Sequence, residues 1–378
     1  MLSRGDRVIT MSYLYTIAPA RQQPLLSSTV RSTREPHPYA ISEQPLSACQ
    51  KCLLYASMPI WLPLLSVLVF VRFVCFIALM ILLLVPCGLA TLGAPVGVPL
   101  RGIRRTVSRV AVGAIGRGCL ACFGCGWGML KVRGEYDPSS PVVVCAPHVG
   151  MTDAYVWMVL DLPRPVILEP YTKIPVVATL LRAASALPVP VPSASTMGKT
   201  PSSGKLAKVA SSDAGPDAKP KSATAAVREK IIEHKRTFVP GDAPIALFPE
   251  GITHNGRTIL GFFSGGFEGG STVQPVVIQY QYKHYNGHAF LGSLPEHLMK
   301  IFANPWLSIE VDFLPAISPS AAQKADGSLL AHATRSAMAS ATGLPLHEMG
   351  AKDLRDEMKR KAVAAREAKQ AKASNDLL

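Results

Sequence analysis

His148 and Asp153 are the residues of this sequence with the clearest potential for catalysis. Four residues separate them in the segment APHVGMTD, and a histidine held by a carboxylate is the base half of a Ser-His-Asp triad. No G-x-S-x-G motif supplies the serine. A substrate hydroxyl would then replace it. Asp153 would accept a hydrogen bond from one imidazole nitrogen, and the other nitrogen would take the hydroxyl proton.

A second motif, Phe248-Pro249-Glu250-Gly251, follows about a hundred residues later. It puts a carboxylate and a flexible glycine at the predicted end of a strand, where they could meet a polar head group. Together the two motifs predict acyl transfer from an activated ester to an alcohol. Taken alone, His148 would be interpreted as a hydrogen-bonded core histidine and Asp153 as a carboxylate at a helix start. The two motifs together favour catalysis.

Four segments resemble the glycerolipid acyltransferase superfamily, in particular its lysophosphatidylcholine acyltransferase-like branch. They occur in the order typical of that branch, between about Leu53 and Met358, which makes a chance match improbable. The segments are APH followed by Asp153, FPEGITHN at 248–255, VQPVVIQY at 273–280 and IEVDFLPAISPS at 309–320.

The resemblance implies roles for named residues. His148 and Asp153 would be catalytic, and acyl-CoA would be a substrate, with no cofactor and no metal. The residues expected to bind the glycerol-phosphate part of the acceptor are Glu250, Gly251, Thr253 and Arg257.

The sequence also departs from the family pattern. Ile252 stands where threonine is usual, and Phe263 stands where lysine is common. The family's middle motif ends in arginine, whereas the corresponding segment 187–193 has none; Arg182 lies in the preceding predicted helix. These departures leave open a catalytically silent relative.

Four functions therefore remain as hypotheses. The leading one is acylation of a lysophospholipid, with lysophosphatidylcholine or lysophosphatidylethanolamine favoured by the branch resemblance. Acylation of lysophosphatidic acid or glycerol 3-phosphate is the alternative. A transacylase would share the same motifs, and a non-catalytic membrane scaffold is the hypothesis from a different class.

Composition favours a membrane over nucleic acid as the partner. The formal net charge is +14 over 378 residues, but aromatic residues make up only 7% and no zinc-finger or stacking motif accompanies the charge. Arg101, Arg104 and Arg105 directly follow an apolar segment and predict contact with anionic lipid. A membrane-length segment separates Cys49 and Cys52 from the later cysteines, which makes one shared zinc site improbable. The eight cysteines are therefore interpreted as free thiols of a reducing compartment.

The apolar segment predicts an integral membrane protein, with the endoplasmic reticulum as the expected site and the catalytic domain on the cytosolic face. Residues 1–50 are rich in Ser, Arg and Pro and are expected to be disordered. Residues 51–100 form the membrane-embedded segment, in which Arg72 alone is charged between Lys51 and Arg101. Two arms flank Arg72, at 52–71 and 73–92, and could be two spans. The family resemblance favours a helical hairpin.

Residues 101–350 are predicted to form the acyltransferase domain, a mixed-sheet αβ sandwich. Expected strands are 129–132, 142–145, 165–168, 187–191, 245–248, 273–280 and 307–313; expected helices are 153–160, 175–186, 223–238 and 328–342. Segment 193–226 can bury almost nothing and is interpreted as a disordered insertion. Residues 351–378 are expected to be a charged helical tail.

Overall fold

The computed structural model describes residues 16–17, 38, 47–95, 97–161, 163–189, 223–282, 286–290, 293–357, 359–360 and 363. The strands are β1 (Thr16–Ile17), β2 (Leu130–Arg133), β3 (Val142–Ala146), β4 (Arg164–Leu168), β5 (Leu187–Val189), β6 (Ile245–Leu247), β7 (Val273–Gln281) and β8 (Ser308–Phe313). The helices are α2 (Ala48–Ala90), α3 (Gly102–Cys122), α4 (Thr152–Leu160), α5 (Pro175–Ala183), α6 (Ala223–Thr237), α7 (Leu294–Ala303), α8 (Ala321–Ala325) and α9 (Gly327–Thr342), with 3-10 turns η1 (Glu169–Lys173) and η2 (Ser264–Gly266).

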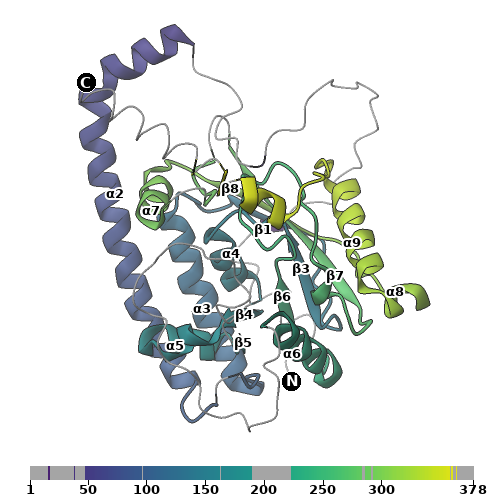
Figure 1. Ribbon diagram of the computed structural model, residues 1–378. Coiled ribbons are helices and arrows are strands. Elements are labelled where there is room, and N and C mark those ends of the chain that lie inside the picture. Colours follow the sequence, from purple (N-terminus) through teal and green to yellow (C-terminus); the bar gives the residue numbers. More distant parts are fainter. Residues whose placement is uncertain are drawn as a thin grey trace, which may run out of the picture.

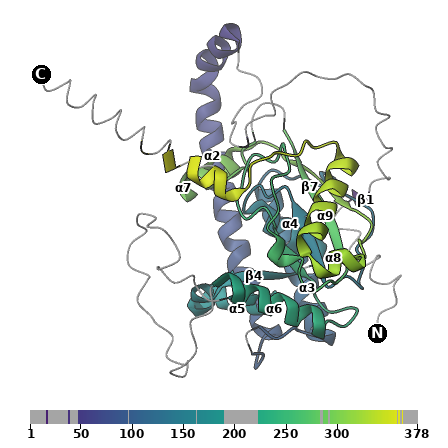
Figure 2. The same cartoon turned by 45° about the vertical axis from the view of Figure 1, so that its right-hand side comes forward.

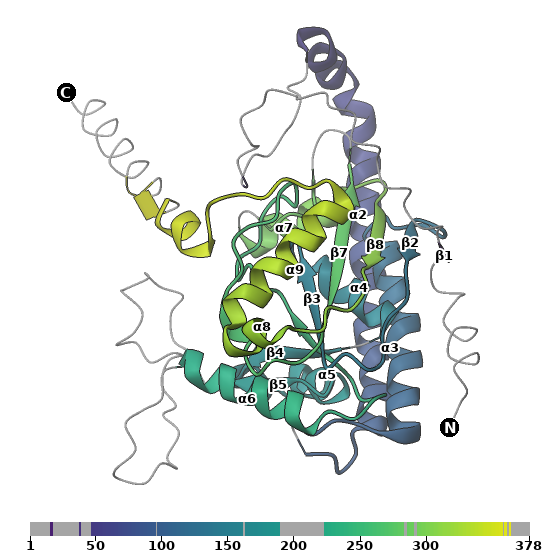
Figure 3. The ribbon, with the colours of Figure 1, turned by 90° about the vertical axis from the view of Figure 1, so that its right-hand side faces the viewer.

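The strands form one sheet in the order β1-β2-β8-β7-β3-β6-β4-β5. The pair β7/β8 is antiparallel and the other neighbours are parallel. Helices cover both faces, with α3 and α4 on one side and α6, α8 and α9 on the other (Figure 1; Figure 3). The mixed-sheet α/β fold expected from the sequence is therefore confirmed, and the expected strands and helices are present to within three residues.

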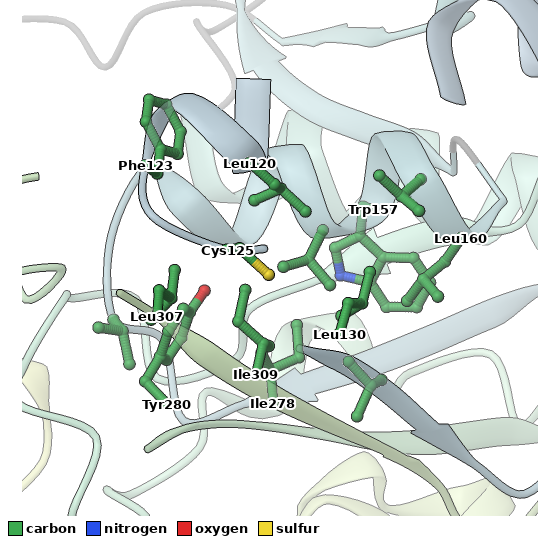
Figure 4. Close-up of a cluster of buried hydrophobic side chains, with 14 of the residues drawn as sticks. Leu120, Phe123, Cys125, Leu130, Trp157, Leu160, Ile278, Tyr280, Leu307 and Ile309 are labelled. Carbon is green, nitrogen blue, oxygen red and sulfur yellow. The ribbon is translucent and has the colours of Figure 1, made fainter. Parts of the chain in front are cut away.

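Strand β3 lies in the centre of the sheet because its continuous apolar run is buried on both faces. Val143 and Cys145 face the core beneath α3 and α4, whereas Val142, Val144 and Ala146 face the core beneath α6 and α9. Figure 4 shows the first core, where side chains from two helices and three strands meet: Leu120, Cys125, Leu130, Trp157, Ile278 and Ile309. The carboxyl end of this rigid strand carries His148.

The apolar segment is one continuous helix, so the expected hairpin at Arg72 is wrong. Helix α2 runs for 43 residues through Arg72, despite three internal prolines. The physical reason lies 230 residues away: the Arg72 guanidinium donates hydrogen bonds to the carbonyls of Phe302, Asn304 and Pro305, in the last turn of α7 and directly after it. Unpaired carbonyls at a helix end suit a cation. The Arg72 charge therefore finds its partners without a turn in α2.

Helix α2 is long and apolar enough to cross a membrane, and it is the one such helix in the described chain. Its N-terminal half extends beyond the domain (Figure 2), and there large side chains such as Leu53, Ile60, Leu64 and Phe70 are exposed. The C-terminal half packs on the domain through Phe76 and other buried side chains. Bare apolar surface of this length is costly in water, at about 25 cal/mol per Å².

Three helices were not expected from the sequence: α3, α7 and the short α8. Helix α3 packs against α2 and α4 through small residues: a side chain at Gly116 would meet Met158, and one at Gly118 would meet Leu79. Helix α7 packs against α2 and reaches the catalytic side of the sheet. The predicted insertion lies mostly outside the described residues, but its last four residues belong to α6. Most of segment 1–50, expected to be disordered, and most of the tail also lie outside them, but Thr16–Ile17 pair with β2 as strand β1 and α2 begins at Ala48. Leu354, at the start of the tail, is buried.

Candidate active site

The structure brings His148 and Asp153 together at the carboxyl end of β3. The Nδ1 atom of His148 lies 2.7 Å from Oδ2 of Asp153, which sits in the first turn of α4. The same oxygen accepts hydrogen bonds from the backbone N–H groups of Val149 and Gly150, at 2.9 and 3.3 Å. Since a carboxylate of this kind only accepts, Nδ1 carries the proton. The Nε2 atom is then left as the basic nitrogen.

The second motif holds His148 in place through its backbone and its ring. Oε2 of Glu250 accepts a hydrogen bond from the His148 N–H at 2.6 Å, and the His148 carbonyl accepts one from the N–H of His254 at 3.0 Å. The Phe248 ring packs on the imidazole with 4.2 Å between centroids. The two motifs, a hundred residues apart in sequence, thus form one unit around His148.

Glu250 is fully buried and all its polar capacity faces the protein. Oε1 accepts a hydrogen bond from the N–H of Leu260 at 2.8 Å, and Oε2 also contacts Nε2 of His254 at 3.1 Å. His254 Nδ1 accepts from the N–H of Gly256, so Nε2 carries the proton and donates to the carboxylate. Glu250, predicted to bind substrate, is thus not among the described residues that line the cavity, and its contacts hold the backbone around His148.

The other residues predicted to bind substrate are dispersed. Thr253 lines the pocket and donates its hydroxyl proton to the Phe290 carbonyl at 3.0 Å. Gly251 adopts a φ of +64°, and a Cβ there would stand 2.5 Å from the Phe263 ring, so only glycine fits. Arg257 packs on the Tyr282 ring and donates to its hydroxyl at 2.7 Å, outside the pocket lining.

Two residues that pack around Asp153 were not predicted from the sequence. Tyr280, in β7, donates its hydroxyl to Oδ1 of Asp153. Burial and the nearby Asp153 charge raise the pKa of Tyr280 well above its ordinary value, so it remains a donor at physiological pH. His288 stacks on Tyr280 and is held between Thr152 and Asn304, at 2.9 and 3.0 Å. Burial lowers the pKa of His288 to about 3, so its ring is neutral. These contacts join residues far apart in the sequence, so no local sequence motif could have predicted them.

We predict that Tyr280→Phe lowers kcat by roughly 10-fold, the effect of losing one hydrogen bond to a charged group, while both KM values stay near wild type. The reason is that the Asp153 carboxylate, which orients His148, loses the one donor to Oδ1 found among the described residues. Steady-state kinetics check this, with Tyr136→Phe as the control, because the Tyr136 hydroxyl is buried, has no hydrogen-bond partner among the described residues and lies outside the pocket. Equal kcat in Tyr280→Phe and wild type would contradict the role.

A cavity of about 490 Å³ opens in front of His148. Its polar lining consists of His148, Asp153, Thr253 and His297, and the other lining residues are glycine or apolar. A second cavity, of about 370 Å³ and almost wholly apolar, lies between α2, α3, α4 and α5. The two share five lining residues, so they adjoin: Met151, Ala154, Pro165, Ala246 and Phe248. Arg182 lines neither cavity.

Comparison with known proteins bears on what such a site does. No family model matches the chain. The lysophospholipid acyltransferase LPCAT4 of Xenopus tropicalis is 30% identical over 60% of this chain and 39% of its own length. Human lysophosphatidylcholine acyltransferase 2 is 29% identical over 68% of this chain and 42% of its own length. The lysophospholipid acyltransferase LPEAT1 of Arabidopsis thaliana is 29% identical over 58% of this chain and 49% of its own length. The curated relatives are lysophospholipid acyltransferases.

The resemblance drawn from the sequence motifs is thereby confirmed. The chain spans less than half the length of each of these three relatives. Among solved structures, the 1-acyl-sn-glycerophosphate (LPA) acyltransferase PlsC of Thermotoga maritima aligns with a TM-score of 0.37 and 15% identity, over 61% of this chain and 78% of that one. A likeness of that size carries no argument here.

Proposed function

We propose that this protein transfers a fatty acyl group from acyl-CoA to the free hydroxyl of a lysophospholipid, with His148 as the general base and Asp153 as its orienting partner. The relatives named as lysophospholipid acyltransferases support the reaction class. The reaction would serve phospholipid synthesis or remodelling.

One observation carries the proposal: the cavity holds a poised base but no protein nucleophile. His148 has Nδ1 fixed and Nε2 without a hydrogen-bond partner among the described residues. No serine, cysteine or lysine is among the described residues that line the cavity, and the Thr253 proton is donated to a carbonyl. A base in this setting activates a hydroxyl that arrives with the substrate.

The steps then follow from the geometry. Nε2 of His148 takes the proton of the acceptor hydroxyl as its oxygen attacks the thioester carbonyl carbon. The C–O bond forms, the C–S bond breaks, and the departing CoA sulfur takes the proton from the imidazolium. Asp153, fixed by its four hydrogen bonds, stabilises the imidazolium during the exchange. The adjoining apolar cavity is the natural place for the acyl chain.

The lining of the cavity favours an acceptor with a zwitterionic head group. Lysophosphatidic acid and glycerol 3-phosphate carry a phosphate monoester, which proteins usually bind with arginine or lysine. No arginine or lysine is among the described residues that line the cavity, and the Phe263 ring stands beside Gly251, at the position where the family resemblance led us to expect lysine. Lysophosphatidylcholine or lysophosphatidylethanolamine therefore fits the cavity better.

A panel of acceptors tests this proposal. Membranes containing the protein, given labelled acyl-CoA, are expected to acylate lysophosphatidylcholine or lysophosphatidylethanolamine at least 10-fold faster than lysophosphatidic acid or glycerol 3-phosphate. Product formed without acyl-CoA would identify a transacylase instead. Absence of product with every acceptor would favour the non-catalytic scaffold.

We also propose that α2 makes this an integral membrane protein of the endoplasmic reticulum with a cytosolic catalytic domain. The helix leaves its N-terminal half uncovered for about 36 Å, by 1.5 Å per residue over residues 48–71, which exceeds a hydrocarbon core of about 30 Å. Arg101 and Arg104 are exposed beside its C-terminal end and suit anionic lipid, although Arg101 also pairs with Asp242. Arg105 is largely buried and pairs with Asp161.

Alkaline carbonate is therefore expected to leave the protein in the membrane pellet. The reason is that extraction would return the uncovered side chains of α2 to water. Immunoblotting of pellet and supernatant measures the partition, with a peripheral protein of the same membranes as the control. Recovery in the supernatant would show that α2 does not insert.

A further inference from the structure

His297 is a buried histidine of the cavity lining whose ring nitrogens make no hydrogen bond of ordinary geometry with the described residues. It lies on the inner face of α7 and is 2% exposed, and the Ala289 carbonyl lies near its ring. Buried polar groups are nearly always hydrogen-bonded, since an unmet one costs about 1–3 kcal/mol. His288, which is also buried on this side of the sheet, has both nitrogens engaged. His297 therefore requires a separate explanation.

The ring of His297 is fixed at the catalytic cavity. Helix α7 begins at the cap Ser293, whose hydroxyl accepts from the N–H of Glu296, and this helix presents His297 to the cavity. The Phe290 ring packs edge-on with 4.8 Å between centroids. On the other side, a Cβ at Gly150 would stand 3.3 Å from Nε2 and Cε1. Gly150 belongs to the loop that donates to Asp153, so His297 lies close to the base.

The other polar side chains of the cavity lining are already committed. Asp153 accepts four hydrogen bonds and Thr253 donates to a carbonyl, which leaves Nε2 of His148 and the ring of His297 as the polar groups of the lining that could meet a substrate. Burial lowers the pKa of His297 to about 4, opposed by the Ala289 carbonyl, so the ring is neutral at neutral pH. A neutral imidazole offers one donor and one acceptor, which match an uncharged hydroxyl or carbonyl oxygen better than a phosphate.

We infer that His297 is a substrate-binding residue whose ring hydrogen-bonds an uncharged hydroxyl or carbonyl oxygen of a substrate in the His148 cavity. This inference rests on the proposed function and deepens it. The oxygen belongs either to the glycerol part of the acceptor lipid or to the thioester of the donor. In both cases the contact forms on binding and fills the hydrogen-bonding capacity that the free protein leaves open.

Replacement by an apolar ring separates binding from stability. His297→Phe is expected to raise one KM, for acceptor or for acyl-CoA, by roughly 3- to 10-fold, the value of one hydrogen bond, with kcat within about 2-fold. Its Tm is expected to equal or exceed that of wild type, because two unmet polar atoms leave the interior. His297→Gln retains a donor and an acceptor and should restore much of the KM. If His297 had only a structural role, His297→Phe would not combine wild-type stability with a raised KM, and His297→Gln would not restore that KM.

The substrate whose KM rises is the one that carries the oxygen bound by His297. A raised KM for the lysophospholipid places this oxygen on the acceptor, and a raised KM for acyl-CoA places it on the donor. Tyr136→Phe, which removes a buried hydroxyl that lies outside the cavity and has no hydrogen-bond partner among the described residues, is the control and should change neither KM. Unchanged KM values in His297→Phe would overturn the inference. A large fall in Tm in both His297→Phe and His297→Leu would also overturn it, because the ring would then hold the fold.

A direct measurement of ligand binding distinguishes failure of this inference from failure of the proposed function. In full-length His148→Ala protein, thermal stabilisation by a soluble short-chain lysophosphatidylcholine and by acyl-CoA is titrated with and without His297→Phe. If wild type shows no turnover, the proposed function fails, yet weaker binding of either ligand in the double variant still supports the inference. Equal binding of both ligands would contradict the inference whatever the turnover.

Discussion

Replacing His148 with alanine is expected to lower kcat by roughly 10²- to 10⁴-fold, the usual contribution of a general base. The loss should fall on kcat rather than on the acceptor KM, because Nε2 acts on a proton in transfer. Thermal stability should stay close to wild type, since the ring is partly exposed and its side-chain hydrogen bond is to Asp153 alone.

Turnover of labelled acyl-CoA in detergent-solubilised protein measures this effect. His332→Ala is the matched control, because His332 is exposed on α9 and lines neither cavity. Asp153→Asn should also be damaging, since an amide can orient the ring wrongly and cannot stabilise the imidazolium. A His148→Ala protein with kcat within 3-fold of wild type would refute the assignment of the base.

The second large effect is expected at Glu250, and it concerns the fold of the site. Glu250→Ala removes the acceptor for two backbone N–H groups and for His254, and should lower the free energy of unfolding by about 3–5 kcal/mol, as for a broken buried charged contact. Activity should fall with it, because the His148 backbone loses its partner. Urea unfolding and kinetics on the same preparations give both values.

Glu250→Gln makes the test specific. Oε1 and Oε2 each accept from a backbone N–H, so either orientation of the amide puts an NH₂ group against a donor. The glutamine variant should therefore also lose stability, whereas a carboxylate that only bound substrate would tolerate the change. Glu233→Gln is the control, since Glu233 is exposed and pairs with Arg236 at the surface. Wild-type stability in Glu250→Gln, with a raised acceptor KM, would return Glu250 to the substrate-binding role.

The sequence predicted the central sheet well because its strands are defined by local pattern. The run at Val142–Ala146 is apolar throughout and is buried on both faces, and the helix after it begins at Thr152, one residue before the expected Asp153. His148 and Asp153 are five positions apart, so a strand end followed by a helix start brings them together. The motif that carries the site is thus also the motif that shapes its backbone.

Features that depend on distant partners were not predictable in the same way. Arg72 appeared to mark a turn, but its partners are carbonyls in the last turn of α7 and directly after it. Helix α3 is rich in glycine and arginine, and its helical state relies on close packing against α2. Tyr280 reaches Asp153 across 127 positions. Helix α7, which carries His297, did have a local signal in Ser293, Pro295 and Glu296, the pattern of a helix start.

The most direct test of the central claim is the stoichiometry of the reaction. Purified full-length protein in lysophosphatidylcholine-containing vesicles is given labelled acyl-CoA, and free CoA thiol and diacyl product are counted in the same tubes. His148-dependent transfer predicts one diacyl lipid for each thiol released, and neither product above background in His148→Ala. Thiol released without diacyl lipid would show that water, not a lipid hydroxyl, is the acceptor. Equal diacyl product in wild type and His148→Ala would show that His148 is not the base.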